Sequence, residues 1–377
     1  MQKGPSVEAV VQERYTEAAR NVEPALCCPT DYDPALLEAI PAEVRERDYG
    51  CGDPSRHLER GDCVLDLGSG SGKACFIAAQ VVGPSGRVIG IDANDEMLTL
   101  ARRCQAGVAE KIGFDNLKFL KARIQDLRLD LERLDEWLSR QPVTSCQEWR
   151  SLEEYADRLR CESPLIADNS IDVVVSNCVL NLVTLVDRCD LFTEISRVLR
   201  PGGRAVISDI VSTEDIPEHL RTDATLWSGC LSGAFREDAF LEAFETAGFT
   251  GIEILARQAE PWAVIEGIEF RSLTVQAFTT LPGPLRDRQQ EVIYRGPWKT
   301  VTDDSEQTFH RGRRQTVCEQ TYQTLMQSPY AGEIIGIPSR VDPDVVKFDG
   351  CDQQREAADR SAVLPGDTCS QSGESCC

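Results

Sequence analysis

The sequence lacks the features that mark membrane-spanning, secreted and nucleic-acid-binding proteins. No apolar run reaches the roughly 18 residues of a membrane-spanning helix. The first residues, MQKGPSVEAVVQERY, are polar and contain no apolar signal core. Basic residues are scarce, since 40 Lys and Arg stand against 62 Asp and Glu, for a net charge of −22. Contact with nucleic-acid phosphates needs a basic surface, so we expect no binding to nucleic acid. Because a membrane span and a signal core are also missing from the pattern, we expect a cytoplasmic protein that does not bind membranes.

Zinc-binding motifs and a general base are also missing. The chain has only three histidines, which are scattered, and no C-x-x-C pair, so no local zinc site is predicted. Sixteen cysteines are nevertheless present. Without a secretion signal, a static disulfide framework is not expected. Buried thiols serve as small hydrophobic residues, an interpretation that accounts for about half of the sixteen.

Residues 64–73, VLDLGSGSGK, are the stretch around which the chain is organised. They predict the end of a buried parallel strand at residues 64–67, a turn with three glycines, and the start of a helix. Glycine has no Cβ, so the backbone N–H groups of such a turn can approach a ligand closely. Residues 88–92 predict a second strand that ends in Asp92. An acid at that place can accept hydrogen bonds from a ribose diol.

A dinucleotide-binding fold has the same order of strand, turn, helix, strand and acid, and an unrelated α/β protein can carry an ordinary glycine-rich loop. Two details favour S-adenosylmethionine. Asp66 lies inside the motif, where it can meet a cationic amino group rather than a pyrophosphate. The glycines at 68, 70 and 72 do not follow the dinucleotide spacing G-x-G-x-x-G. The stretch resembles motif I of class I S-adenosylmethionine methyltransferases.

Predicted strands and helices alternate through most of the chain, which predicts an α/β fold with a doubly wound, mostly parallel, Rossmann-like sheet. The charged, helical pattern at about 127–165 predicts an insertion between the third and fourth strands. After about residue 257 the composition changes, and a strand is predicted at 270–278. The predicted domains are an N-terminal helical segment with thiol loops (1–60), a methyltransferase domain (61–257), a small C-terminal α+β subdomain (258–345) and a flexible tail that contains cysteines (346–377).

Three cysteines fall in predicted loops or at strand ends. Cys51 lies in a turn rich in glycine and proline, Cys178 follows the fourth strand, and Cys230 lies between two glycines. Ligands of open α/β sheets bind outside the carboxyl ends of the strands, so we expect these thiols around the cofactor site. Thiolates are soft ligands that suit thiophilic centres. Trivalent arsenic held by three thiolates keeps a lone pair, which can displace the methyl group of a sulfonium without a protein base.

The motifs around these cysteines resemble those of arsenite S-adenosylmethionine methyltransferases. The resemblance covers about residues 45–235 and rests on four segments: DYGCG at 48–52, LDLGSGSG at 65–72, SNCVLNL at 176–182 and WSGCLSGA at 227–234. It implies that Cys178 and Cys230 hold As(III), with Cys51 as the third thiol. It also implies that a further N-terminal cysteine, here Cys27 or Cys28, forms a disulfide with Cys51. Thioredoxin or glutathione would then reset the enzyme.

The same resemblance implies a set of residues for S-adenosylmethionine. They are Tyr49, Asp66, Gly68, Gly70, Asp92, Ile124 and Asn177, with the neighbouring Ser69, Gly72, Ala93, Met97 and Gln125. By pattern alone, Tyr49 is equally consistent with simple packing. The chain departs from the family's pattern in its adjacent Cys27–Cys28 pair, in Asp48 where a tyrosine is usual, and in the long insertion.

Two other functions are consistent with the sequence. One is methyl transfer to another small carbon or sulfur nucleophile. The other is a thiol-rich protein that sequesters a metalloid on a methyltransferase fold without catalysis. The terminal Cys376–Cys377 pair fits either a metalloid-capturing tail or an end without function.

Overall fold

The computed structural model of the chain describes residues 7–26, 30–47, 49–281 and 288–339. The chain forms two compact units, Met1–Thr280 and Leu281–Cys377. The predictions for Cys27, Cys28 and the tail 346–377 lie outside the described residues. In the part of the chain that is described, no helix is long and apolar enough to cross a membrane.

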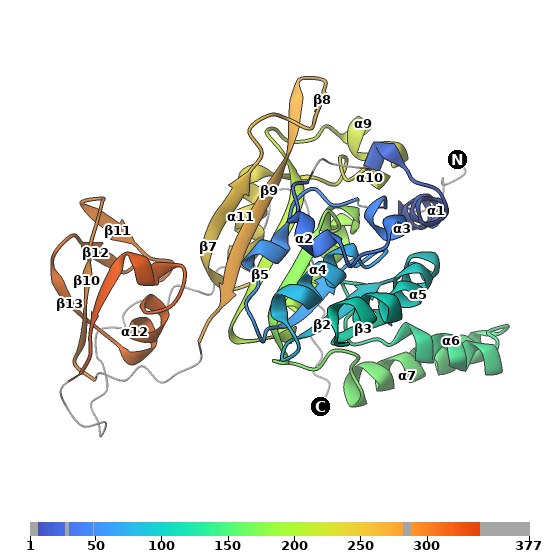
Figure 1. Ribbon diagram of the computed structural model, residues 1–377, viewed down its shortest axis with the longest axis horizontal. Helices are drawn as coiled ribbons and strands as arrows, with labels where there is room; N and C mark the ends of the chain where they lie inside the picture. Colours follow the sequence, from blue (N-terminus) through green and yellow to red (C-terminus); the bar gives the residue numbers. More distant parts are fainter. Residues whose placement is uncertain (1–6, 27–29, 48, 282–287, 340–377) are drawn as a thin grey trace. The chain divides into compact units, whose positions relative to one another are not determined.

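The first unit is built on a nine-stranded sheet whose main path has the order β3-β2-β1-β4-β5-β9-β7 (Figure 1). Its first five strands pair in parallel: β1 (Cys63–Leu67), β2 (Arg87–Asp92), β3 (Leu117–Lys121), β4 (Ile171–Asn177) and β5 (Leu199–Ser212). The helices that follow β1, β2, β4 and β5 include α4 (Lys73–Val82), α5 (Asp95–Ile112), α8 (Arg188–Val198), α9 (Glu218–Arg221), α10 (Ala224–Ser228) and α11 (Glu237–Thr246). The predicted mostly parallel, doubly wound α/β fold is confirmed.

The boundary of this unit differs from the prediction. Residues 270–278 were assigned to the C-terminal subdomain, but they belong to β9 (Ile268–Thr279), which pairs antiparallel with both β5 and β7 (Phe249–Arg257). The short strands β6 (Phe235–Arg236) and β8 (Ala263–Ile265) join the same sheet. The unit therefore ends at Thr280 instead of residue 257. The alternation of apolar and polar residues at 270–278 predicted a strand, but it could not indicate which distant strands it pairs with.

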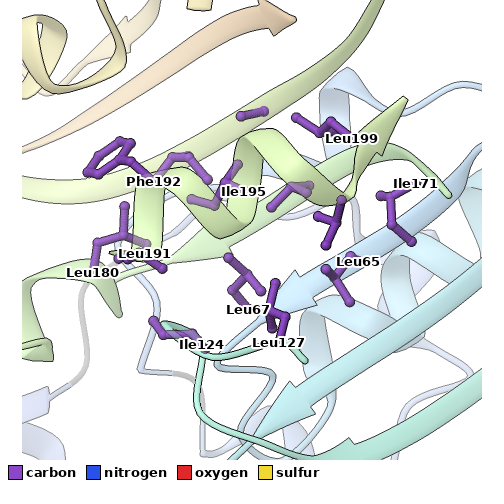
Figure 2. Close-up of a cluster of buried hydrophobic side chains, with 14 of the residues drawn as sticks. Leu65, Leu67, Ile124, Leu127, Ile171, Leu180, Leu191, Phe192, Ile195 and Leu199 are labelled. Atoms are coloured by element: carbon purple, nitrogen blue, oxygen red, sulfur yellow. The ribbon is translucent and has the colours of Figure 1, made fainter. Parts of the chain in front are cut away.

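The core lies on both faces of the sheet. Successive side chains of β1 point to opposite faces, so Leu65 and Leu67 enter one apolar cluster and Val64 enters another. In the first cluster, Leu191 and Ile195 of α8 pack over the strands (Figure 2). Burying one such side chain fully contributes about 1.5–3 kcal/mol relative to leaving it exposed. This packing fixes the strands so that their carboxyl ends meet along one edge.

Two helical segments flank that edge. The N-terminal segment contains α1 (Val7–Arg20), α2 (Pro34–Leu37) and α3 (Ala42–Arg45), and α1 packs against α5 and α10. The segment predicted as an insertion contains α6 (Leu131–Arg140) and α7 (Cys146–Glu162), between β3 and β4. Short 3-10 turns complete the unit at Pro24–Leu26, Pro54–His57, Leu180–Leu182 and Leu185–Asp187.

The second unit has its own small core, formed by Val292, Tyr294, Phe309, Val317, Leu325 and Ile334. A three-stranded antiparallel sheet has the order β13-β10-β14, with β10 (Gln290–Tyr294), β13 (Arg314–Val317) and β14 (Ile334–Ile337). The remaining elements are β11 (Thr300–Thr302), β12 (Thr308–His310), α12 (Glu319–Leu325) and a 3-10 turn at Tyr330–Gly332.

Candidate functional site

A cavity of about 920 Å³ lies at the carboxyl edge of the parallel strands. Its size falls in the range of small-molecule sites. It is lined by all but one of the predicted cofactor residues: Tyr49, Asp66, Gly68, Ser69, Gly70, Asp92, Ala93, Met97, Ile124, Gln125 and Asn177.

Gly72 does not line the cavity. It is the N-cap of α4 and has a left-handed backbone, with φ of 88°. A Cβ at this position would lie 2.9 Å from Cζ of Phe119 and 3.1 Å from the Phe76 ring. The absence of a Cβ at Gly72 lets the helix pack closely on the sheet, and the contact of Gly72 with the cofactor stays a prediction.

The glycine-rich turn and Asp92 form one hydrogen-bonded unit. Gly68 and Gly70 have φ of 73° and 51°, which residues with a Cβ adopt rarely. The Gly70 N–H donates to Asp92 Oδ2 at 2.8 Å, and the Asn94 N–H donates to Oδ1 at 2.8 Å. Burial raises the pKa of Asp92, and these N–H donors oppose the rise. An ideal Cβ on Gly70 would meet no atom within 4 Å, so the backbone there borders open space that a ligand can approach.

Asp66 is a buried acid in the cavity wall. Burial raises its pKa to about 6, the Cys75 S–H that donates to Oδ2 at 3.1 Å lowers it, and the neighbouring Asp92 charge raises it. A cation placed in the cavity would stabilise the ionised form of this carboxyl group.

Tyr49 contributes both to packing and to the cavity wall. Its hydroxyl donates to the Ala18 carbonyl at 3.0 Å and accepts from the Glu23 N–H at 3.1 Å. Its ring meets that of Tyr15 edge to face, with centroids 6.2 Å apart. The tyrosine thus fastens the N-terminal segment beside the cavity.

Cys178 and Cys230 share an unusual backbone conformation. Both have φ of 63°, in the left-handed region, and both side chains are buried. This conformation costs a residue with a Cβ roughly 1–2 kcal/mol. The Cys178 N–H donates to the Ser208 carbonyl at 2.8 Å, and the Cys230 N–H donates to the Trp227 carbonyl at 2.9 Å. The surrounding structure therefore holds both thiols in orientations that a relaxed chain rarely adopts.

The side chain of Asn177 joins the Cys51 turn to the end of β4. Its Oδ1 accepts from the N–H groups of Cys51 at 2.8 Å and Gly52 at 3.1 Å. Its Nδ2 donates to the Gly52 carbonyl at 2.7 Å. A Cβ on Gly50 would overlap the Asn177 amide, and one on Gly52 would lie 2.6 Å from Ser208 Oγ. The glycines that flank Cys51 thus allow its backbone to lie directly against β4 and β5.

The three predicted thiols lie in one buried cluster with Ile210, Leu231 and Phe270. The sulfurs of Cys51 and Cys178 and a carboxylate oxygen of Asp209 all lie within 4.8 Å of one another. Cys230 lies beside this group, and its S–H donates to the Cys178 carbonyl at 3.1 Å. Cys178 also lines the large cavity, so the thiol cluster and the cavity meet at this residue.

Sequence analysis missed Asp209, which lies on β5. Burial raises its pKa to about 7, while N–H donors from Ile210, Asn181 and Leu180 oppose the rise. Asn181 Nδ2 donates to Oδ1 at 2.7 Å. One sign of its importance was present in the sequence, an acid inside the apolar run AVISDIV. Its place beside the thiols could not be predicted, because it depends on the pairing of Asn177 in β4 with Ser208 in β5.

Tyr15 was also missed as a site residue, because the sequence shows it only as one apolar position of a helix. Its hydroxyl lies 4.0 Å from the Cys230 sulfur, and its side chain lines the cavity. The pKa of Tyr15 is raised well above its ordinary value. Burial is the largest cause, and the neighbouring Cys230 and Cys178 add to it. Tyr15 thus joins α1 to the thiol cluster.

The parallel sheet, the glycine-rich turn and the cavity define a methyltransferase of the S-adenosylmethionine-dependent class. A family model described as a methyltransferase domain matches residues 58–154 and 154–248. In the second unit, a model described as a domain of unknown function (DUF8838) matches residues 282–365.

The relatives define the family more narrowly. The chain is 31% identical over 382 residues to an arsenite methyltransferase of Aquipseudomonas alcaligenes, covering 95% of this chain and 99% of that protein. It is 32% identical to an arsenite methyltransferase of Homo sapiens, covering 79% of this chain and 73% of that protein. The chain therefore belongs to the arsenite methyltransferase family.

A solved structure agrees with this assignment. The crystal structure of an arsenic (III) S-adenosylmethionine methyltransferase from Chlamydomonas reinhardtii matches with a TM-score of 0.55 and 26% identity. The match covers 85% of this chain and 100% of that chain.

The geometry around Asn177 gives a first prediction. Asn177→Ala removes the side-chain hydrogen bonds to the backbone of Cys51 and Gly52. It should therefore lower the free energy of unfolding by about 1–3 kcal/mol. It should also speed alkylation of Cys51, measured by peptide mass spectrometry. Asn116→Ala is the matched control, because Asn116 Nδ2 bridges the Ala79 and Gly83 carbonyls instead. Unchanged Cys51 alkylation in the Asn177 variant would contradict the anchoring role.

Proposed function

We propose that this chain transfers methyl groups from S-adenosylmethionine to As(III) held by the thiolates of Cys51, Cys178 and Cys230. The observation that carries the proposal is the approach of the Cys51 and Cys178 sulfurs within 4.8 Å, together with the position of Cys178 in the cavity wall. Three thiols from distant parts of the sequence share one buried cluster, which suits a soft, thiophilic substrate.

The cavity fits S-adenosylmethionine in its polar groups. Asp92 lies in the wall, where its carboxylate can accept from a ribose diol. Asp66 offers a buried carboxyl group to the cationic amino group, and the open space at Gly70 allows close backbone approach. When bound, this cofactor supplies a methyl group activated by a sulfonium. Asp66 and Asp92 would hold it in the cavity that Cys178 also lines, so its methyl group would be available to an acceptor at that thiol.

The thiol cluster supplies the acceptor. Each thiol that replaces a hydroxyl of arsenous acid forms an As–S bond and breaks an As–O bond, and water is released. Asp209 and Tyr15 lie beside the sulfurs, and the carboxylate can take a thiol proton during this exchange. The apolar side chains of Ile210, Leu231 and Phe270 keep water from the bound substrate. The arsenic lone pair remains available for attack on the methyl carbon.

The electron balance of repeated transfer requires a reductant. When arsenic gives its lone pair to the methyl carbon, it is oxidised by two electrons to the pentavalent state. Oxidation of two thiols to a disulfide releases two electrons and two protons, which return it to the trivalent state. We infer that Cys51 pairs with Cys27 or Cys28 in this step, on the sequence resemblance alone. Thioredoxin or glutathione then reduces the disulfide.

Substitution of the thiols tests the proposal. Cys178→Ser and Cys230→Ser should each lower the production of methylated arsenicals from As(III) by about a hundredfold or more, because a hydroxyl is a poor ligand for a soft centre. Chromatography coupled to arsenic detection measures the products. Binding of S-adenosylhomocysteine should persist, which shows that the variants remain folded.

The matched control is Cys318→Ser, which replaces a buried thiol of the second unit where a serine hydroxyl can still cap α12. It should methylate As(III) like the wild type. Wild-type rates in the Cys178 and Cys230 variants would refute the thiolate site, and As(III) binding without any methylated product would indicate a sequestering protein.

The pKa of Asp66 gives a further prediction. A cationic amino group binds the ionised carboxylate, so affinity for S-adenosylhomocysteine should be full above about pH 6 and should fall as the pH falls below it. The dissociation constant should rise by about tenfold for each pH unit below that value.

Calorimetric titration from pH 5 to 8 measures this profile. The Asp66→Asn variant should bind S-adenosylhomocysteine more weakly than the wild type at pH 8, and its affinity should change less with pH. Asp115→Asn, at an exposed acid before β3, should keep the wild-type slope. An Asp66 variant with the full pH dependence would exclude this carboxyl group as its source.

A further inference from the structure

The inserted helices α6 and α7 form a substantial part of the wall of the same cavity. Leu131 and Leu134 of α6 line it. The contribution of α7 is larger and consists of Trp149, Leu152, Glu153, Ala156, Asp157 and Arg160. None of these residues belongs to the glycine-rich turn or to the cysteine motifs, so the insertion builds a wall of its own.

The order of the strands indicates which part of the cofactor this wall meets. Along the sheet edge the strands run β3, β2, β1, β4, β5. Cys178 follows β4, where the proposed function places the methyl group, and Asp92 ends β2, where a ribose diol can bind. The base is attached to the far side of the ribose. It therefore extends past β2 toward β3, next to the residues that follow β3 and next to α7.

Several interactions dock the insertion firmly at this edge. Arg160 Nε donates to Asp126 Oδ2 at 3.0 Å, which joins α7 to the segment after β3. Lys121 of β3 pairs with Asp135 of α6 at 2.7 Å. The Trp137 and Tyr155 rings stack with centroids 5.7 Å apart and planes inclined by 17°, which holds α6 against α7.

The side of α7 that lines the cavity has the chemistry of a base site. Leu152 and Ala156 provide apolar surface, and Trp149 lies at the cavity with its side chain 55% exposed. A planar heterocycle that covers such a surface buries it from water. Glu153 adds a carboxylate in the same wall, which can accept from an exocyclic amino group.

We propose that α7 closes the base subsite of the cofactor, and that Arg160 is the positioning residue that holds this helix over Asp126. The inference rests on the cofactor part of the proposed function and adds a site for the purine base. It assigns to the insertion, which lies outside the quoted family motifs, the task of binding the donor. The position of the methyl group is taken from Cys178, whereas the test needs only cofactor binding.

The test measures cofactor binding separately from arsenic chemistry. Arg160→Gln should raise the dissociation constant for S-adenosylhomocysteine by about three- to tenfold, since it removes a partly buried ion pair. The turnover number at saturating S-adenosylmethionine should stay unchanged. Arg150→Gln is the matched control, because Arg150 is exposed on the same helix. Wild-type affinity in the Arg160 variant would overturn the proposal.

A second variant keeps the test decisive if Arg160→Gln does not fold. Wild-type tryptophan fluorescence should change when S-adenosylhomocysteine binds, and Trp149→Phe should abolish most of that change. Trp298→Phe, at an exposed tryptophan of the second unit, should keep it. A full signal in the Trp149 variant would exclude α7 from the subsite. If the wild type bound S-adenosylhomocysteine but formed no methylated arsenical, the proposed function would fail and these binding results would still decide the role of α7.

Discussion

The arrangement of the site depends on the side-chain amide of Asn177. With one oxygen and one nitrogen it satisfies three backbone groups of the turn that carries Cys51. These hydrogen bonds hold the turn that carries Cys51 against the end of β4. The flanking glycines make the attachment possible because neither position has room for a Cβ. The next residue, Cys178, has a left-handed backbone, and its sulfur lies within 4.8 Å of that of Cys51.

Burial raises the pKa of two acids along this edge. Asp66 has a pKa raised to about 6 and lies in the cavity wall, where a bound cation would restore its charge. Asp209 has a pKa raised to about 7 and lies beside two sulfurs. Both shifts arise first from desolvation, which disfavours the ionised form of each carboxyl group.

The local features of the site could be predicted from the sequence. The glycine-rich turn, Asp92 and the Cys178 strand end each follow from a short pattern. The features that short patterns do not show depend on distant partners. The role of Gly72 is set by the Phe119 ring, and the membership of β9 in the main sheet is set by β5 and β7. Asp209 and Tyr15 become site residues only when strand pairing and α1 docking bring them to the thiols. The contribution of α7 to the cavity likewise depends on its docking beside β3.

Arsenic K-edge X-ray absorption of the wild-type protein with one equivalent of As(III) tests the central claim most directly. Three sulfur neighbours around arsenic are predicted, with one fewer in each of the Cys51→Ser, Cys178→Ser and Cys230→Ser variants. A first shell dominated by oxygen, or a spectrum unchanged by all three substitutions, would contradict the account.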